Sequence, residues 1–183
     1  MTSPRMAVLG LGNLMRTDDA VGMLALQQLR ADPRLASTVL LIEGGTLGLD
    51  LLHPLEGVTH LLALDAVDTG SAPGTLVRFA GDDLEDLPIA KSVHLLGFSD
   101  LLGALHLTGS VLREVVVLGV QPAAIEWGTV LTPLVETGMA RLVEATLQQI
   151  GQWARETKKD RFPSVPVALT GSLAAAGESE WYW

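Results

Sequence analysis

Residues 9–22, with the sequence LGLGNLMRTDDAVG, decide the fold that we expect for this chain. The apolar run 6–9 that leads into them is typical of a buried strand, and Gly10 and Gly12 predict a turn after it. A helical pattern follows the turn. Its four apolar positions share one face of the helix: Val21, Leu24, Ala25 and Leu29. The stretch therefore predicts a strand, a glycine turn and an amphipathic helix.

Two adjacent carboxylates, Asp18 and Asp19, stand where this helix should begin. Asp18 suits the N-cap position, and Asp19 then lies in the first turn, where the helix dipole favours negative charge. The glycines match part of the dinucleotide fingerprint G-x-G-x-x-G, but Met15 occupies the place of the third glycine. Two carboxylates also repel a phosphate and attract a cation. The stretch thus disfavours a nucleotide site and leaves two alternatives, a metal site or simple capping of the helix.

Composition narrows the function classes. The 183 residues contain no cysteine, which excludes disulfides, thiolate metal ligands and a cysteine nucleophile. A net charge of −9 argues against a nucleic-acid partner. No apolar stretch is long enough to span a bilayer, and the N-terminus lacks the pattern of an export signal. We therefore expect a cytoplasmic protein that is not bound to a membrane.

The rest of the chain alternates strand and helix patterns. Strands are predicted at 38–42, 60–64, 75–79 (an edge strand or hairpin arm) and 114–120. Helices are predicted at 47–55, 92–107 and 132–158, the last with Thr132 as its cap and Pro133 as its first residue. The pattern predicts an α/β fold, a single-domain three-layer sandwich with a twisted, mostly parallel sheet and helices on both faces. This domain should cover residues 1–160, followed by a flexible tail at 161–183.

Three side chains with metal-binding chemistry should meet at one edge of this sheet. Asp19 follows the first strand, Asp65 ends the third, and His94 opens the helix before the fifth. Ligands of open parallel sheets bind beyond the carboxyl ends of the strands. Two carboxylates and an imidazole suit a divalent ion such as zinc or nickel. Each residue also has a purely structural interpretation, as a cap or a backbone-bonded histidine. Glu43 is a fourth candidate at the same edge.

Four motifs of the chain, in order, resemble those of the nickel–iron hydrogenase maturation proteases. They are Gly10-x-Gly12-Asn13-x-x-x-x-Asp18-Asp19-x-x-Gly22, Glu43-Gly44-Gly45-Thr46-x-Gly48, Asp65-Ala66 and Ser92-x-His94-x-x-Gly97-x-x-Asp100. The resemblance implies a cytoplasmic endopeptidase that removes the C-terminal peptide of the hydrogenase large-subunit precursor. It also implies that Asp19, Asp65 and His94 are the catalytic and metal-contacting residues. The nickel belongs to the precursor, no organic cofactor is expected, and zinc can occupy the site adventitiously.

Two positions depart from the family pattern. Many members have Glu where this chain has Asp19, so Asp18 is an alternative source of the carboxylate. Glu43 stands where the family often has Asp, which points to a different substrate preference. The sequence leaves open whether metal or carboxylate activates the attacking water. It also leaves two alternative functions, a non-catalytic nickel-sensing chaperone of the large subunit and, less favoured, a nucleotide-binding domain.

Overall fold

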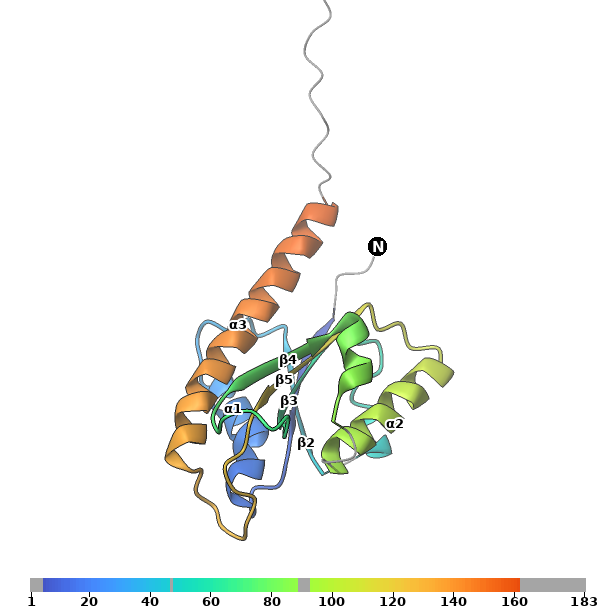
Figure 1. The fold of residues 1–183 in the computed structure, drawn as a ribbon. Helices are drawn as coiled ribbons and strands as arrows, with labels where there is room; N and C mark the ends of the chain where they lie inside the picture. Colours follow the sequence, from blue (N-terminus) through green and yellow to red (C-terminus); the bar gives the residue numbers. More distant parts are fainter. Residues whose placement is uncertain (1–4, 47, 89–92, 162–183) are drawn as a thin grey trace, which may run out of the picture.

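The computed structural model describes residues 5–46, 48–88 and 93–161. Within them, one five-stranded sheet has the strand order β2–β1–β3–β5–β4. Four of its strands are parallel: β1 (Met6–Leu11), β2 (Leu40–Gly45), β3 (His60–Ala66) and β5 (Glu114–Val120). The edge strand β4 (Leu76–Ala80) runs antiparallel to β5. The predicted α/β fold with a mostly parallel sheet is confirmed (Figure 1).

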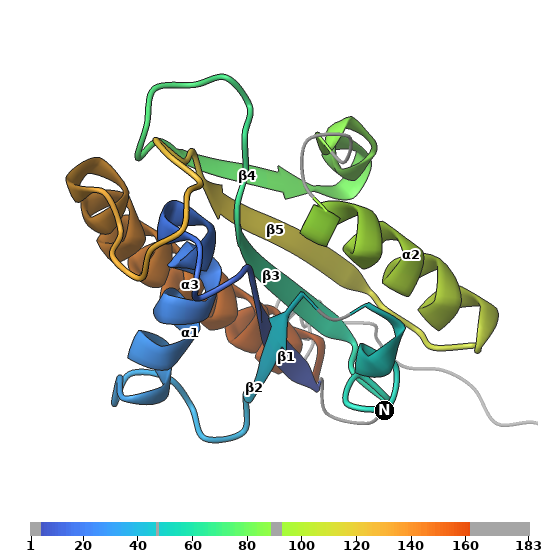
Figure 2. The ribbon, with the colours of Figure 1, turned by 90° about the horizontal axis from the view of Figure 1, so that it is seen from below.

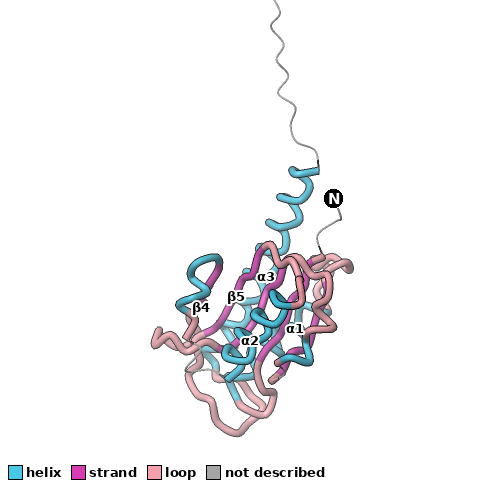
Figure 3. Tube along the Cα trace, turned by 90° about the vertical axis from the view of Figure 1, so that its right-hand side faces the viewer, coloured by secondary structure: helices cyan, strands magenta, loops and turns pink. Residues whose placement is uncertain are grey.

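Helices cover both faces of the sheet. α1 (Val21–Arg30) and α3 (Pro133–Arg161) lie on one face, and α2 (Val93–Leu107) lies on the other, as Figures 1 and 3 show. The described residues also form three short 3₁₀ segments: η1 (Thr17–Ala20), η2 (Leu49–Leu51) and η3 (Gly81–Asp86). The layers are those of the predicted three-layer sandwich.

The central strand β3 shows why the sheet is covered on both faces. Its alternate residues Leu62 and Leu64 belong to the core beneath α1 and α3, whereas Leu61 and Ala63 belong to the core beneath α2. All four are fully buried. Successive side chains of a strand point to opposite faces, so a strand that is apolar at every position needs cover on both sides.

Two glycines bring the start of α1 against the carboxyl ends of the strands. Gly12 has a φ of 114°, which favours glycine, and a Cβ there would meet the carbonyl oxygen of Asp19. A Cβ at Gly22 would meet the carbonyl oxygens of Leu64 and Leu11. The segment between β1 and α1 therefore lies directly over the ends of β1 and β3, and Asp19 lies within it.

Three local predictions need correction. β1 continues through Gly10 to Leu11, because a parallel strand needs no side chain at Gly10 to keep its pairing with β2 and β3. In place of the helix predicted at 47–55 there is the 3₁₀ turn η2, since the stretch between Gly48 and Pro54 is too short for α-helix propagation. The stretch 81–86, for which the sequence pattern predicts neither helix nor strand, forms the 3₁₀ segment η3.

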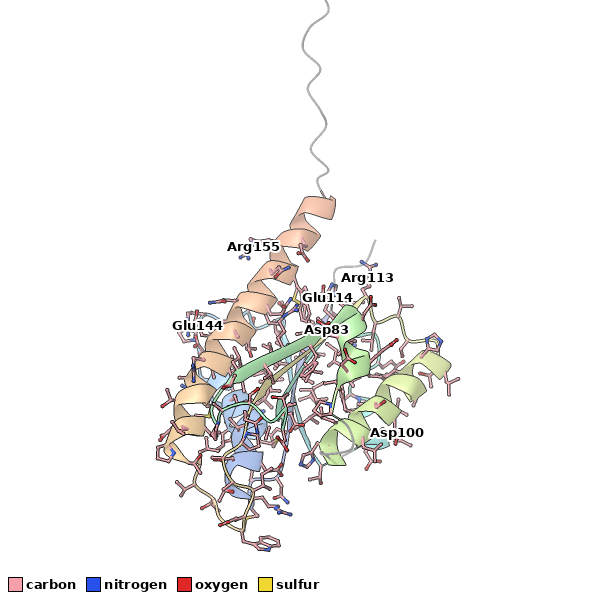
Figure 4. The ribbon with its side chains drawn as sticks, in the orientation of Figure 1. Asp83, Asp100, Arg113, Glu114, Glu144 and Arg155 are labelled. Carbon is pink, nitrogen blue, oxygen red and sulfur yellow. The ribbon has the colours of Figure 1, made fainter. Side chains whose placement is uncertain are left out.

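The outer surfaces of the two helical layers carry charged side chains. Figure 4 labels Glu144 and Arg155 on α3 and Asp100 on α2, on opposite sides of the sheet. Within the described ranges, no helix is both long and apolar enough to cross a membrane. α3 continues to Arg161, slightly beyond its predicted end. The predicted tail lies, from residue 162 onward, outside the described residues.

Candidate functional site

Asp19 and His94 meet at the carboxyl edge of the sheet. The Nε2 atom of His94 lies 3.2 Å from Oδ1 and 3.0 Å from Oδ2 of Asp19. Each side chain is 10% exposed, so the pair is nearly buried but still reached by solvent. Asp19 comes from the turn before α1 and His94 from the first turn of α2, on the opposite face of the sheet. The fold thus joins two residues that are 75 positions apart in the sequence.

The backbone of the glycine turn orients Asp19. The amide of Asn13 donates a hydrogen bond to Asp19 Oδ2 at 3.1 Å, and the amide of Gly12 donates to the carbonyl of Gly45 at 2.9 Å. Asn13 in turn accepts a bond from the amide of Met15 through its side-chain oxygen. The Gly10-x-Gly12-Asn13 motif therefore fixes the carboxylate through main-chain contacts, which need no particular side chain at positions 11 and 14.

Asp19 also controls the charge of His94. The hydrogen bond that His94 donates to the Asp19 carboxylate raises the pKa of His94 above its usual value, although burial of the imidazole opposes this shift. The negative charge of Asp65 raises the same pKa, and the positive charge of Arg16 lowers it. The imidazole is thus held toward its protonated form in the absence of a bound cation.

Asp65 lies at the same edge of the sheet. It is the sixth residue of β3, is fully buried, and pairs in register with Gly119 of β5. Its Oδ1 accepts a bond from the amide of Ala66 at 2.9 Å. The influence of its charge on His94 places it in the electrostatic surroundings of the pair. As they stand, no three His, Cys, Asp or Glu side chains within the described residues form a set that could hold a metal ion.

Asp18 does not cap α1, contrary to the prediction. It lies in η1, and its fully buried carboxylate accepts four hydrogen bonds from the loop at 121–132. The donors are the amides of Ala123 (2.8 Å), Ala124 (2.9 Å) and Thr132 (2.7 Å) and the hydroxyl of Thr132 (2.9 Å). These bonds occupy both oxygens of the carboxylate. Asp18 therefore does not substitute for Asp19 beside His94.

Sequence reasoning missed the role of the loop at 121–132, which binds Asp18 and Thr17. Thr17 has a φ of 30°, unusual for a β-branched residue, and its hydroxyl donates to the carbonyl of Ala124 at 2.8 Å and accepts from the amide of Glu126 at 3.0 Å. Its amide donates to the carbonyl of Gly128. Figure 2 shows this loop beside the segment that precedes α1. No sequence signal pointed to this contact, because Asp18 equally suited the N-cap of a helix.

The remaining polar candidates have other partners or other positions. Glu43 lies near the carboxyl edge, as predicted, because it pairs in register with Gly10 of β1, but its carboxylate forms an ion pair at 2.7 Å with Arg30 in the last turn of α1. His60 begins β3, five residues before Asp65, which places it about 16 Å away along the strand. The other three histidines lie away from the site: His53 in a loop, His60 at the opposite edge of the sheet and His106 in the last turn of α2.

Comparison with known proteins assigns the chain to a family. The profile described as hydrogenase maturation protease matches residues 23–149. The hydrogenase 2 maturation protease of Escherichia coli is 34% identical over 161 residues, which cover 87% of this chain and 96% of the relative. The hydrogenase expression/formation protein HupD of Bradyrhizobium diazoefficiens is 33% identical over 174 residues, which cover 93% and 89%.

Solved structures agree with this assignment. The hydrogenase maturating endopeptidase HybD from E. coli superposes with a TM-score of 0.76 at 33% identity, over 81% of this chain and 93% of that one. The hydrogenase maturation protease HybD from Thermococcus kodakarensis gives a TM-score of 0.68 at 25% identity, over 79% and 98%. The chain belongs to the hydrogenase maturation proteases and is accordingly a hydrolase, an endopeptidase of hydrogenase maturation.

Proposed function

We propose that this protein removes the C-terminal peptide of a nickel-loaded hydrogenase large-subunit precursor in the cytoplasm, and that Asp19, Asp65 and His94 recognise the nickel. The reaction adds water across one peptide bond, with hydroxyl joining the carbonyl carbon and a proton joining the released amine. The nickel is part of the substrate in this proposal. The protein's own contribution is to bind that ion and to position the peptide bond beside it.

The observation that carries the proposal is the Asp19–His94 pair. Its nitrogen–oxygen separations of 3.0 and 3.2 Å match those of two adjacent ligands of one ion, which are about 3 Å apart when each bond is about 2.1 Å. A cation that entered between them would replace the proton that the pair now shares. The pair therefore has the spacing that an incoming divalent ion requires, once the ion has displaced that proton.

The donor set also favours an ion brought by the substrate. Two carboxylates and one imidazole, with no thiolate in the chain, make a weak and open site for a first-row metal. A precursor that already holds nickel through its own ligands would supply the missing affinity. Binding of peptide and of metal would then depend on each other, and a precursor without nickel would bind poorly.

The test is a single-turnover assay with purified precursor in nickel-loaded and nickel-free forms, read by mass spectrometry of the large subunit. We expect shortening of the nickel-loaded form only. His94→Ala should abolish it, whereas His106→Ala, an exposed histidine at the far end of the same helix, should not alter it. Equal cleavage of both forms would overturn the role of nickel. Binding without shortening would support the chaperone alternative instead.

A further inference from the structure

An exposed apolar surface adjoins the Asp19–His94 pair. Four side chains form it, and we name it the apolar rim: Leu14, Met15, Ile125 and Trp127. Trp127 is 81% exposed and Met15 is 55% exposed. The residues come from two segments, the turn after β1 and the loop at 121–132, which lie side by side (Figure 2). Large apolar side chains gathered on one surface mark an interaction site more often than a chance exposure.

Hydrogen bonds between the two segments hold this surface in place. The amide of Gly128 donates to the carbonyl of Met15 at 3.0 Å, and Arg16 Nη2 donates to the carbonyl of Ile125 at 3.0 Å. The guanidinium carbon of Arg16 also lies 6.0 Å from the centre of the Trp127 ring, at the limit of a cation–π contact. A partner that binds here meets a backbone that is already ordered, so little conformational entropy is lost on binding.

The rim is connected to the site through a single turn. Met15 donates its amide to the side chain of Asn13, and Asn13 donates its own amide to Asp19. Two hydrogen bonds thus link Met15 to Asp19 through Asn13. A segment of the precursor that reaches Asp19 therefore lies close to the rim. Trp, Met and Arg are also the residue types that are enriched in interface centres.

We propose that the apolar rim is the docking surface for the folded body of the hydrogenase large-subunit precursor, with Trp127 as its anchor. This inference rests on the proposed function and adds the place where the substrate protein is held. The occupant follows from continuity with the site, because a precursor that presents its nickel to Asp19 and His94 must lie over the adjoining rim. The two segments carry one charge of each sign here, since Arg16 contacts Ile125 and Trp127 and the exposed Glu126 stands between these two residues. The rim therefore suits an apolar patch of the precursor rather than a strongly charged one.

The experiment measures kcat and KM with nickel-loaded precursor for the wild type, Trp127→Ala, Trp127→Phe and Met15→Ser. Leu107→Ser is the matched control, since Leu107 is 87% exposed at the far end of α2, about 20 Å along the helix from His94. We expect Trp127→Ala to raise KM at least tenfold, about 1.4 kcal/mol, with kcat within twofold of the wild type. Trp127→Phe should recover part of the loss, Met15→Ser should raise KM severalfold, and Leu107→Ser should change neither constant.

Each outcome decides the matter. A KM within twofold of the wild type for both Trp127→Ala and Met15→Ser overturns the docking surface while leaving the proposed function intact. A fall in kcat at unchanged KM also overturns it, because the rim would then act in the chemical step. If the wild type does not shorten the precursor, the proposed function itself is wrong, and that result is visible without any variant.

Discussion

Replacement of Asp18 tests how the site is built, because its carboxylate joins the turn before α1 to the loop at 121–132. Oδ2 accepts three hydrogen bonds and Oδ1 accepts one, all between 2.7 and 2.9 Å. In Asp18→Asn the amide oxygen can keep the three bonds at Oδ2, but the NH₂ group then faces the amide of Thr132, so one bond is lost and one donor is stranded. Bonds to a charged group contribute about 1.5–3 kcal/mol each, and the retained bonds weaken when the charge is removed.

We expect Asp18→Asn to lower the free energy of unfolding by about 3 kcal/mol, which for a chain of this size lowers Tm by about 6–12 °C. Urea unfolding followed by circular dichroism measures the first value, and calorimetry measures the second. Asp82→Asn, at an exposed position in η3, is the control and should stay within about 0.5 kcal/mol of the wild type. An Asp18→Asn protein as stable as that control would refute the argument that this carboxylate holds the loop.

The structure also predicts the direction of three further effects on stability: substitution of glycine, titration of His94 and titration of His60. Gly22→Ala should destabilise the protein by about 3 kcal/mol or more, because the added Cβ meets the carbonyl oxygen of Leu64. Gly103→Ala on α2, where an added Cβ meets no other atom, should instead stabilise the protein by up to about 1 kcal/mol. Unfolding in denaturant measures both changes. The pair with Asp19 raises the pKa of His94, so its stabilisation is complete below pH 6.5 and is lost as the pH rises through the raised pKa. Burial lowers the pKa of His60, so stability is lost as the pH falls through 6.5. In unfolding measured from pH 5 to 8, His94→Gln should remove the loss of stability at high pH, and His60→Gln should remove the loss at low pH.

The sequence predicts the sheet well because its strands are buried on both faces. The range 114–120 coincides with β5, and the pattern of Val21, Ala25 and Leu29 gives the buried face of α1. Such positions are decided by apolar burial, which a sequence displays directly. Segments at 47–55 and 81–86 were less predictable, since short turns depend on the ends of neighbouring elements rather than on their own periodicity.

The position of the site at the carboxyl edge of the sheet was also predictable in part. Strand order and the rule for parallel sheets bring Asp19 and His94 to one place, and the contact between them confirms that convergence for this pair. The role of Asp19, Asp65 and His94 in metal recognition stays a prediction. What the sequence could not show was which of two adjacent acids faces the imidazole, because η1 replaces the first α-helical turn and separates the directions of Asp18 and Asp19.

Asp18 and Asp19 lie in the same 3₁₀ segment, η1, but bind different partners. Asp18 is fully buried and binds the loop that carries Ile125 and Trp127, while its neighbour Asp19 binds His94. Both contacts depend on the same 3₁₀ segment, so a displacement of the loop shifts the backbone from which Asp19 projects. Under the two proposals above, docking of the precursor on the apolar rim and binding of its nickel at Asp19 would be linked through Asp18. It follows that Asp18→Asn should impair cleavage even where the protein remains folded, with an increase in KM like that of Trp127→Ala and a fall in kcat that Trp127→Ala does not share.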